Sequence, residues 1–199
     1  MKLRITYNAP VVLTFTLAAI AAFIINSAFP STREWTTAAP ELHGPASFVG
    51  LFGHILGHAS WDHLLGNFMV ILLIGPILEE RHGSGRLLLM ILVTALITGL
   101  INAFVVHSGL LGASGIAFMM ILLASMANVR GGEIPLTFIA VAVVYMGGEI
   151  YHSVHDSGDH VSHAAHLIGG AVGALFGFLF AGRCEPKVSG NVKQIAKKL

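Results

Sequence analysis

Six long apolar stretches divide this 199-residue chain, and they constrain its fold more than any other feature. They lie at about residues 9–29, 63–78, 87–106, 113–129, 134–151 and 162–182. Apolar residues make up 55% of the chain and charged residues only 11%, whereas a soluble domain carries roughly a quarter charged residues. A helix needs about 20 apolar residues to cross a bilayer, and fewer where neighbours adapt. The sequence therefore predicts an all-α integral membrane protein with a six-transmembrane-helix bundle.

Basic residues predict the orientation of these helices. Ten of the eleven Lys and Arg residues flank the stretches on one side, and Arg33 alone lies on the other. Because basic loops stay in the cytoplasm, both termini are expected there. We expect a short cytoplasmic lead over 1–8, a helical core over 9–182 and a basic cytoplasmic tail over 183–199. A net charge of +1 without a basic patch argues against a nucleic-acid partner.

Two segments near the amino terminus need separate interpretation. The first stretch follows basic residues as a signal peptide does, but it is longer than a typical signal-peptide core and lacks an A-x-A cleavage site, so we expect an uncleaved helix. The exterior segment 30–62 holds two tryptophans and many aliphatic residues among glycines and prolines. Tryptophan favours the headgroup region, so this first exterior loop is expected to be partly membrane-inserted.

Four polar side chains are expected at one depth in the membrane. Ser114 and His166 lie sixteen and seventeen residues before the basic residue at the inner end of their stretches, which is roughly 24 and 25 Å along a helix. His63 and Asn67 lie eighteen and fourteen residues before theirs, or roughly 27 and 21 Å. Polar groups at this depth are costly without partners, so they are expected to face the interior of the bundle.

Small residues predict which stretches meet. The sixth stretch carries one helical stripe of a histidine followed by glycines: His166, Gly169, Gly173 and Gly177. The fourth stretch presents one face with two hydroxyls: Ser114, Phe118, Ile121 and Ser125. Small residues permit close approach of membrane helices. If the stripe packs on that face, Ser114 and His166 come within reach of each other.

Three motifs follow one another along these stretches. They are His63-x-x-x-Asn67 with His58 five residues earlier, Gly112-Ala113-Ser114-Gly115, and His166 with Gly169 and Gly173. Together they resemble the second, fourth and sixth helices of the rhomboid family of intramembrane serine proteases. The resemblance covers the six-helix core, and the residues from Glu79 to Gly85 are similar to the family's turn after its second helix. Two departures are Phe118, where the family often has Tyr, and Arg33-Glu34-Trp35, where it usually has Trp-Arg.

The resemblance implies roles for individual residues. Ser114 is the expected nucleophile and His166 the general base, with an oxyanion site formed by His63, Asn67 and the backbone N–H of Ser114. The expected supporting residues are Gly112, Gly115, Phe118, Gly169 and Gly173. No carboxylate is expected at the depth of His166, so the sequence predicts a Ser–His dyad rather than a triad, with packing on Phe118 to orient the imidazole.

Further expectations concern residues around this site. His58 is expected to be structural and to bond within its loop, and Glu79 with Arg81 to cap the cytoplasmic turn. In the family, the fifth helix and the last exterior loop are associated with substrate gating. That corresponds to 134–162 here, with Gly147-Gly148 as a flexible point.

The expected activity is cleavage of transmembrane segments near the outer face of the membrane. Its partners are transmembrane protein substrates and the lipid bilayer, and neither a cofactor nor a metal site is expected. A short chain without organelle signals favours a prokaryotic plasma membrane.

Two alternative functions stay open at this point. One is a catalytically inactive rhomboid-like binding protein, although the presence of both Ser114 and His166 argues against it. The other is a divalent-metal transporter or sensor, because histidines crowd the last exterior loop beside Asp156 and Asp159. These histidines are His152, His155, His160, His163 and His166. The chain lacks the H-E-x-x-H zinc motif and a line of carboxylates through the spans.

Overall fold

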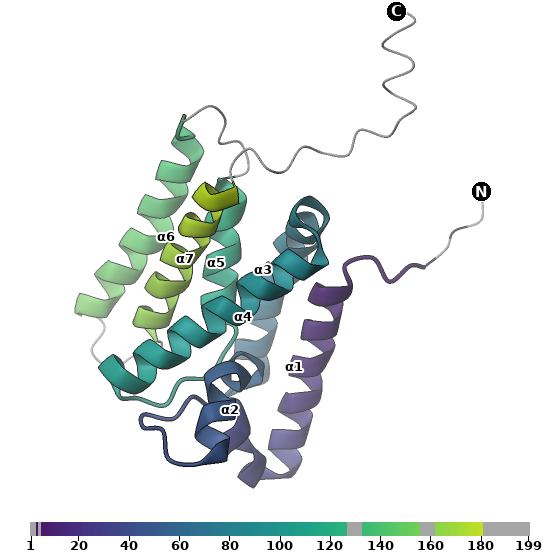
Figure 1. The fold of residues 1–199 in the computed structure, drawn as a ribbon, viewed down its shortest axis with the longest axis vertical. Helices are drawn as coiled ribbons and strands as arrows, with labels where there is room; N and C mark the ends of the chain where they lie inside the picture. The colour runs from purple at the N-terminus through teal and green to yellow at the C-terminus, as the bar shows by residue number, and fades with distance from the viewer. Residues whose placement is uncertain (1–2, 4, 127–132, 156–161, 181–199) are drawn as a thin grey trace, which may run out of the picture.

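The computed structural model describes residues 3, 5–126, 133–155 and 162–180, and these residues are almost entirely helical (Figure 1). Their only extended pairing is an isolated bridge between Ala38 and Leu110. The predictions made for the basic tail over 183–199, for Asp156, Asp159 and His160, and for the inner end of the fourth stretch lie outside the described residues.

Seven α-helices form the described part of the chain. They are α1 (Pro10–Ala28), α2 (Pro45–Gly53), α3 (Trp61–His82), α4 (Ser84–Ile101), α5 (Ser114–Ser125), α6 (Leu136–His155) and α7 (His163–Phe180). Two short 3₁₀ segments, η1 (Pro30–Thr36) and η2 (His54–Leu56), flank α2, and a π-helical turn, η3 (Asn102–Val106), continues α4. In Figure 1, α1 and α6 lie on opposite sides of the bundle.

Within the part of the chain that the structure describes, five helices are long and apolar enough to cross a membrane: α1, α3, α4 with η3, α6 and α7. They correspond to five of the six predicted spans. The remaining stretch, 113–129, contains α5, which is described over 12 residues. A helix of that length rises about 18 Å, whereas the hydrocarbon core is about 30 Å thick. The described part of the fourth stretch is thus a shorter apolar helix, and its role as a full span stays a prediction.

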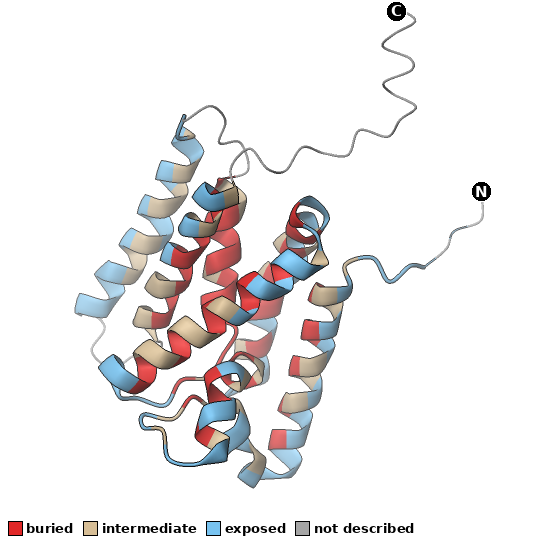
Figure 2. Ribbon diagram, in the orientation of Figure 1, coloured by how far each residue is buried: buried red, intermediate tan, exposed pale blue. Residues whose placement is uncertain are grey.

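α5 occupies the centre of the bundle, as its buried ribbon in Figure 2 shows. Four of its apolar side chains are almost inaccessible: Ile116, Met119, Met120 and Leu122. A helix that is apolar on all sides is stable only when neighbours surround it, and α3, α4 and α7 pack against this one. α6 lies further out and contributes no buried residue within its described length.

Glycines on α7 allow its backbone to touch that of α5. A Cβ added at Gly169 would lie 2.8 Å from the carbonyl carbon of Gly115, and one at Gly173 would lie 2.9 Å from that of Met119. The predicted glycine stripe thus faces α5. However, the glycines contact the backbone of Gly115 and Met119, because closest approach needs a glycine or bare backbone on both sides. The predicted contact face was instead that of Ser114, Phe118, Ile121 and Ser125.

The segment 30–62, predicted to be exterior and called the exterior segment below, contains a compact unit of η1, α2 and η2. Gly50 and Gly57 lie directly against the backbone of Thr37 and Thr36, so α2 and the segment after it pack on the chain that follows α1. Several large apolar side chains of this unit are exposed, among them Phe48 and Phe52. Insertion of the segment into the membrane stays a prediction that these exposed side chains support.

The turn between α3 and α4 anchors the first helix. The buried carboxylate of Glu79 accepts hydrogen bonds from the backbone N–H groups of Val11 and Val12, each at 3.0 Å, and from the Ser84 hydroxyl at 2.7 Å. An acidic group at a helix N-terminus satisfies free N–H groups and opposes the helix dipole favourably. The predicted capping role of Glu79 is confirmed, and it extends to α1.

Candidate active site

The loop that leads into α5 runs through the protein interior and is held by backbone hydrogen bonds. Leu110 pairs with Ala38 in both directions, with N–O distances of 2.8 and 3.0 Å. The N–H of Gly112 donates to the carbonyl of His54 at 2.9 Å. Non-helical backbone at membrane depth is tolerated where the protein itself satisfies its polar groups. These bonds fix the loop just before Ser114.

His58 supports the same loop from the exterior segment. Its Nε2 accepts the N–H of Ala113 at 3.4 Å, and its Nδ1 lies 3.2 Å from the carbonyl of Leu56. Burial lowers the pKa of His58 from 6.5 to about 4, so the ring is neutral near pH 7. Nδ1 therefore carries the proton donated to Leu56, which leaves Nε2 to accept from Ala113. The predicted structural role of His58 within its loop is confirmed.

Ser114 is the first residue of α5 and lies half-buried at the amino-terminal end of that helix. The preceding residue, Ala113, provides no side-chain cap. The first N–H groups of an α-helix have no partner within it and form the positive end of its dipole. Ser114 thus presents a backbone donor beside its own hydroxyl.

His63 and Asn67 lie one turn apart on α3 and face the loop before Ser114. A Cβ at Gly112, whose φ is +126°, would lie 2.8 Å from two ring atoms of His63 and 3.7 Å from Nδ2 of Asn67. The amide of Asn67 is buried, and its Nδ2 has no hydrogen-bond partner among the described residues. Leaving a buried donor unpaired costs about 1–3 kcal/mol. Such a group in a native site needs a functional explanation.

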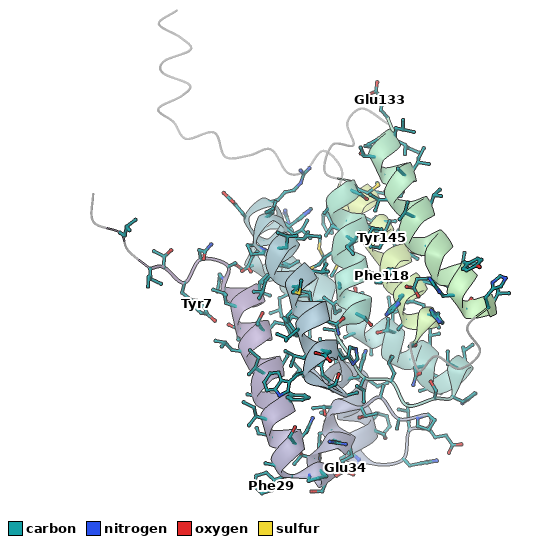
Figure 3. All side chains as sticks on the ribbon, turned by 180° about the vertical axis from the view of Figure 1, so that it is seen from behind. Tyr7, Phe29, Glu34, Phe118, Glu133 and Tyr145 are labelled. Carbon is teal, nitrogen blue, oxygen red and sulfur yellow. The ribbon has the colours of Figure 1, made fainter. Side chains whose placement is uncertain are left out.

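His166 lies in the first turns of α7 and is held by aromatic packing. Its ring stacks on Phe118 of α5 with centroids 4.5 Å apart and planes 7° apart. Tyr145 of α6 contacts Phe118 edge-on at 5.9 Å, and Figure 3 labels both side chains where α6 faces α5. Because Phe118 follows Ser114 by one turn, this stack places His166 beside the start of α5.

Glu149 of α6 lies at the same level as His166, contrary to the prediction. Its Oε2 is 2.9 Å from Nδ1 of His166 and 2.7 Å from Nδ1 of His163. The prediction failed because the depth count followed only the stretches that carry the three motifs. α6 also continues to His155, four residues beyond the predicted span, which places Glu149 well inside the helix. A carboxylate within an apolar stretch was the signal that could have identified it.

The structure brings most of the predicted site residues together. Around the start of α5 lie Ser114, Gly115, Phe118, His166 and Gly169 on one side, and His63, Asn67 and Gly112 on the other. Gly173 lies one turn further along α7 and contacts Met119, so it acts in helix packing only.

The histidines predicted to crowd the last exterior loop lie instead on helices, as far as they are described. His155 belongs to α6 and stacks on Tyr151 with centroids 4.2 Å apart. His163 and His166 belong to α7 and share Glu149.

Comparisons with known proteins agree with this arrangement. The family model described as Rhomboid domain matches residues 45–183. Rhomboid-related protein 1 of Caenorhabditis elegans is 31% identical over 150 residues, which cover 71% of this chain and 42% of that protein. Rhomboid protease GlpG of Pectobacterium atrosepticum is 27% identical over 175 residues, 85% of this chain and 62% of that protein. Rhomboid protease GlpG of Haemophilus influenzae is 26% identical over 129 residues, which cover 63% of this chain and 66% of that protein. The chain spans about two fifths to two thirds of the length of these relatives.

Proposed function

Because the chain belongs to the rhomboid family, we propose that it is an intramembrane serine endopeptidase with Ser114 as nucleophile and His166 as general base. It is an integral membrane protein with several apolar helices that can cross the bilayer. The observation that carries the proposal is the packing of the start of α5 on α7. That packing combines the Phe118–His166 stack with the backbone contact between Gly115 and Gly169.

The reaction follows from this placement. Nδ1 of His166 lies beside Glu149, so Nε2 is the nitrogen available to Ser114. Nε2 takes the proton from Oγ while Oγ forms a bond to the carbonyl carbon of the substrate, and the carbonyl π pair moves to its oxygen. When the oxyanion collapses, the C–N bond breaks and His166 returns the proton to the leaving amine. Water then releases the acyl group by the same steps.

Glu149 adds a third group to the expected dyad. A carboxylate beside Nδ1 favours the tautomer with its proton on Nδ1, and it stabilises the imidazolium that forms after Ser114 loses its proton. Oε2 of Glu149 lies 2.9 Å from Nδ1 of His166 as an ion-pair contact outside hydrogen-bond geometry, so a small rotation of the ring or of the carboxylate is needed for it to act in this way. We assign it a positioning role, because it contacts His166 rather than the substrate.

Three donors surround the place where the oxyanion forms: the Ser114 N–H, the His63 ring and the Asn67 amide. The amide suits this role because its Nδ2 is buried without a partner among the described residues and lies next to Gly112. A donor reserved for an oxygen that becomes charged only during the reaction stabilises the transition state selectively. One such donor contributes roughly 3–4 kcal/mol in a serine protease.

The substrate class follows from the depth of Ser114. Ser114 lies sixteen residues before Arg130, or roughly 24 Å along a helix, and this count supports a nucleophile that reaches peptide bonds below the outer surface. Those peptide bonds belong to transmembrane segments, which must unwind locally before a carbonyl is open to attack. α6 contributes no buried residue, and this supports entry of the substrate from the lipid on its side. Cytoplasmic termini and a prokaryotic plasma membrane remain part of the proposal.

Labelling with a serine-directed fluorophosphonate tests the proposal. The wild-type chain should be labelled and should cleave a transmembrane reporter, whereas Ser114→Ala and His166→Ala should do neither. Ser125→Ala is the matched control, because its hydroxyl lies on the same helix and bonds the Leu122 carbonyl at 2.7 Å. Undiminished cleavage by folded Ser114→Ala would refute the mechanism. A folded wild type that is never labelled would favour an inactive rhomboid-like binding protein.

A further inference from the structure

Three metal-ligating side chains converge where α6 meets α7. They are Glu149, His163 and His166, and each offers one ligand atom within 4.8 Å of the other two. We propose that they form a Zn²⁺ site whose occupation switches off the protease. The binding of zinc stands on these residues alone, whereas the loss of activity rests on the proposed function of His166.

The donor set is one that zinc prefers. Two imidazole nitrogens and one carboxylate oxygen leave a fourth tetrahedral position for water. Bond lengths of about 2.0–2.2 Å imply separations of about 3.4 Å between ligand atoms. The Glu149 oxygen now lies 2.7 and 2.9 Å from the two Nδ1 atoms, so each separation must widen by about 0.5–0.7 Å. Small rotations of the side chains supply that change.

The site is mostly buried but keeps some access to solvent. The side chains of Glu149 and His163 are each 15% exposed and that of His166 is 10% exposed. Phe118 holds the His166 ring by stacking, so one ligand is already oriented. A partly dehydrated site with an oriented ligand loses less entropy on binding than a cluster of mobile surface side chains does.

His163 has no role in the proposed mechanism. It is partly buried, and its Nδ1 hydrogen-bonds to Glu149 while its Nε2 has no partner among the described residues. If His163 served only in packing, its Nδ1 would not need to bond the same Glu149 carboxylate that contacts His166. Metal coordination gives one reason for the positions of all three side chains.

Zinc at this site removes the general base. Coordination uses the lone pair of Nδ1 on His166, so the ring proton of the neutral imidazole resides on Nε2. Nε2 is the nitrogen that must accept the proton of Ser114, and once protonated it is a donor. Glu149 is engaged by the metal at the same time. Zinc binding replaces the exchangeable proton of Nδ1 and leaves a proton on Nε2, and no other bond in the protein changes, so removal of zinc restores activity.

The binding test uses the full chain purified in detergent and titrated with Zn²⁺ against a chromogenic chelator. One zinc ion per chain is expected, and Glu149→Gln and His163→Ala should each weaken binding by at least about tenfold. His43→Ala is the matched control, because His43 and Glu41 form an exposed pair on the exterior segment. Equal affinity in wild type and both site variants would overturn the proposal, as would an equal loss in His43→Ala.

The activity test compares each variant with itself, with and without zinc. Wild-type cleavage should fall over the zinc range in which binding occurs and recover with EDTA, and His163→Ala should need at least about tenfold more zinc for the same fractional loss. Zinc binding without loss of cleavage would overturn the inhibitory role. A chain that binds zinc but cleaves no reporter would refute the proposed protease function and leave the metal site standing.

Discussion

Alanine in place of Gly169 should separate the two helices that carry Ser114 and His166. The new Cβ would lie 2.8 Å from the carbonyl carbon of Gly115 and 3.0 Å from its Cα. Carbon atoms in contact lie about 3.5–4.0 Å apart, so a shift of at least about 0.7 Å is required. The obstacle is backbone at the start of a buried helix, which has no side chain to rotate away. α7 must therefore move relative to α5.

The consequence for catalysis is larger than that for stability. His166 lies three residues before Gly169 on the same helix, so the imidazole moves with it. A misplacement of about 1 Å can reduce a rate about 100-fold, whereas overpacking typically costs about 1–3 kcal/mol of stability. We expect Gly169→Ala to lower kcat by about 10- to 100-fold while the protein still folds.

The measurement is the initial rate of cleavage of a transmembrane reporter, with thermal unfolding of the same preparation. Gly66→Ala in α3 is the control, because a Cβ there meets nothing within 4 Å. It should cleave at the wild-type rate. If folded Gly169→Ala cleaves as fast as Gly66→Ala, the contact between α5 and α7 does not position the catalytic pair.

Three further predictions address other parts of the site. Asn67→Ala should lower kcat by about 10²–10³-fold with little change in KM, and kinetics with unchanged kcat would exclude an oxyanion role. Alanine at both Gly147 and Gly148 should stiffen α6 and slow cleavage, and it causes no clash because a Cβ at either position meets nothing within 4 Å. An unchanged rate would show that flexibility at these two glycines is not needed for gating. The pKa of His58 is about 6.5 in the unfolded chain and about 4 in the folded one, so the unfolded state binds more protons between these values. The free energy of unfolding should therefore fall as pH drops from 6.5 to 4, and it should fall less steeply in His58→Gln. Equal slopes for the two proteins in urea titrations would refute this.

The membrane helices could be predicted well because their signal is local. Each span needs only its own apolar residues: α1 begins and ends within one residue of its predicted stretch, and α7 begins within one residue of its own. The burial of α5 could not be predicted in this way. Its stretch stays apolar because it is buried among protein neighbours, and hydropathy does not distinguish that environment from lipid.

The candidate site was predictable where it depended on depth along a helix. Counting residues placed Ser114 and His166 at one level, and the structure packs the helix starts that carry them against each other. Counting does not specify rotation about the helix axis, and the predicted contact face of α5 was displaced by one residue. Glu149 was not predicted because its stretch carries none of the three motifs. A lone carboxylate within an apolar stretch is nevertheless costly unless it has partners.

The bond between Glu79 and α1 also bears on the order in which the bundle assembles. The acceptor lies 67 and 68 residues after the two N–H groups that it caps. α1 leaves the ribosome long before Glu79 does, so its first turn has no such acceptor while α3 is still being made. α1 can therefore enter the bilayer early but takes its final place only after the α3–α4 turn has formed. A helix that begins before the matched Rhomboid domain thus depends on that domain for the cap of its first turn.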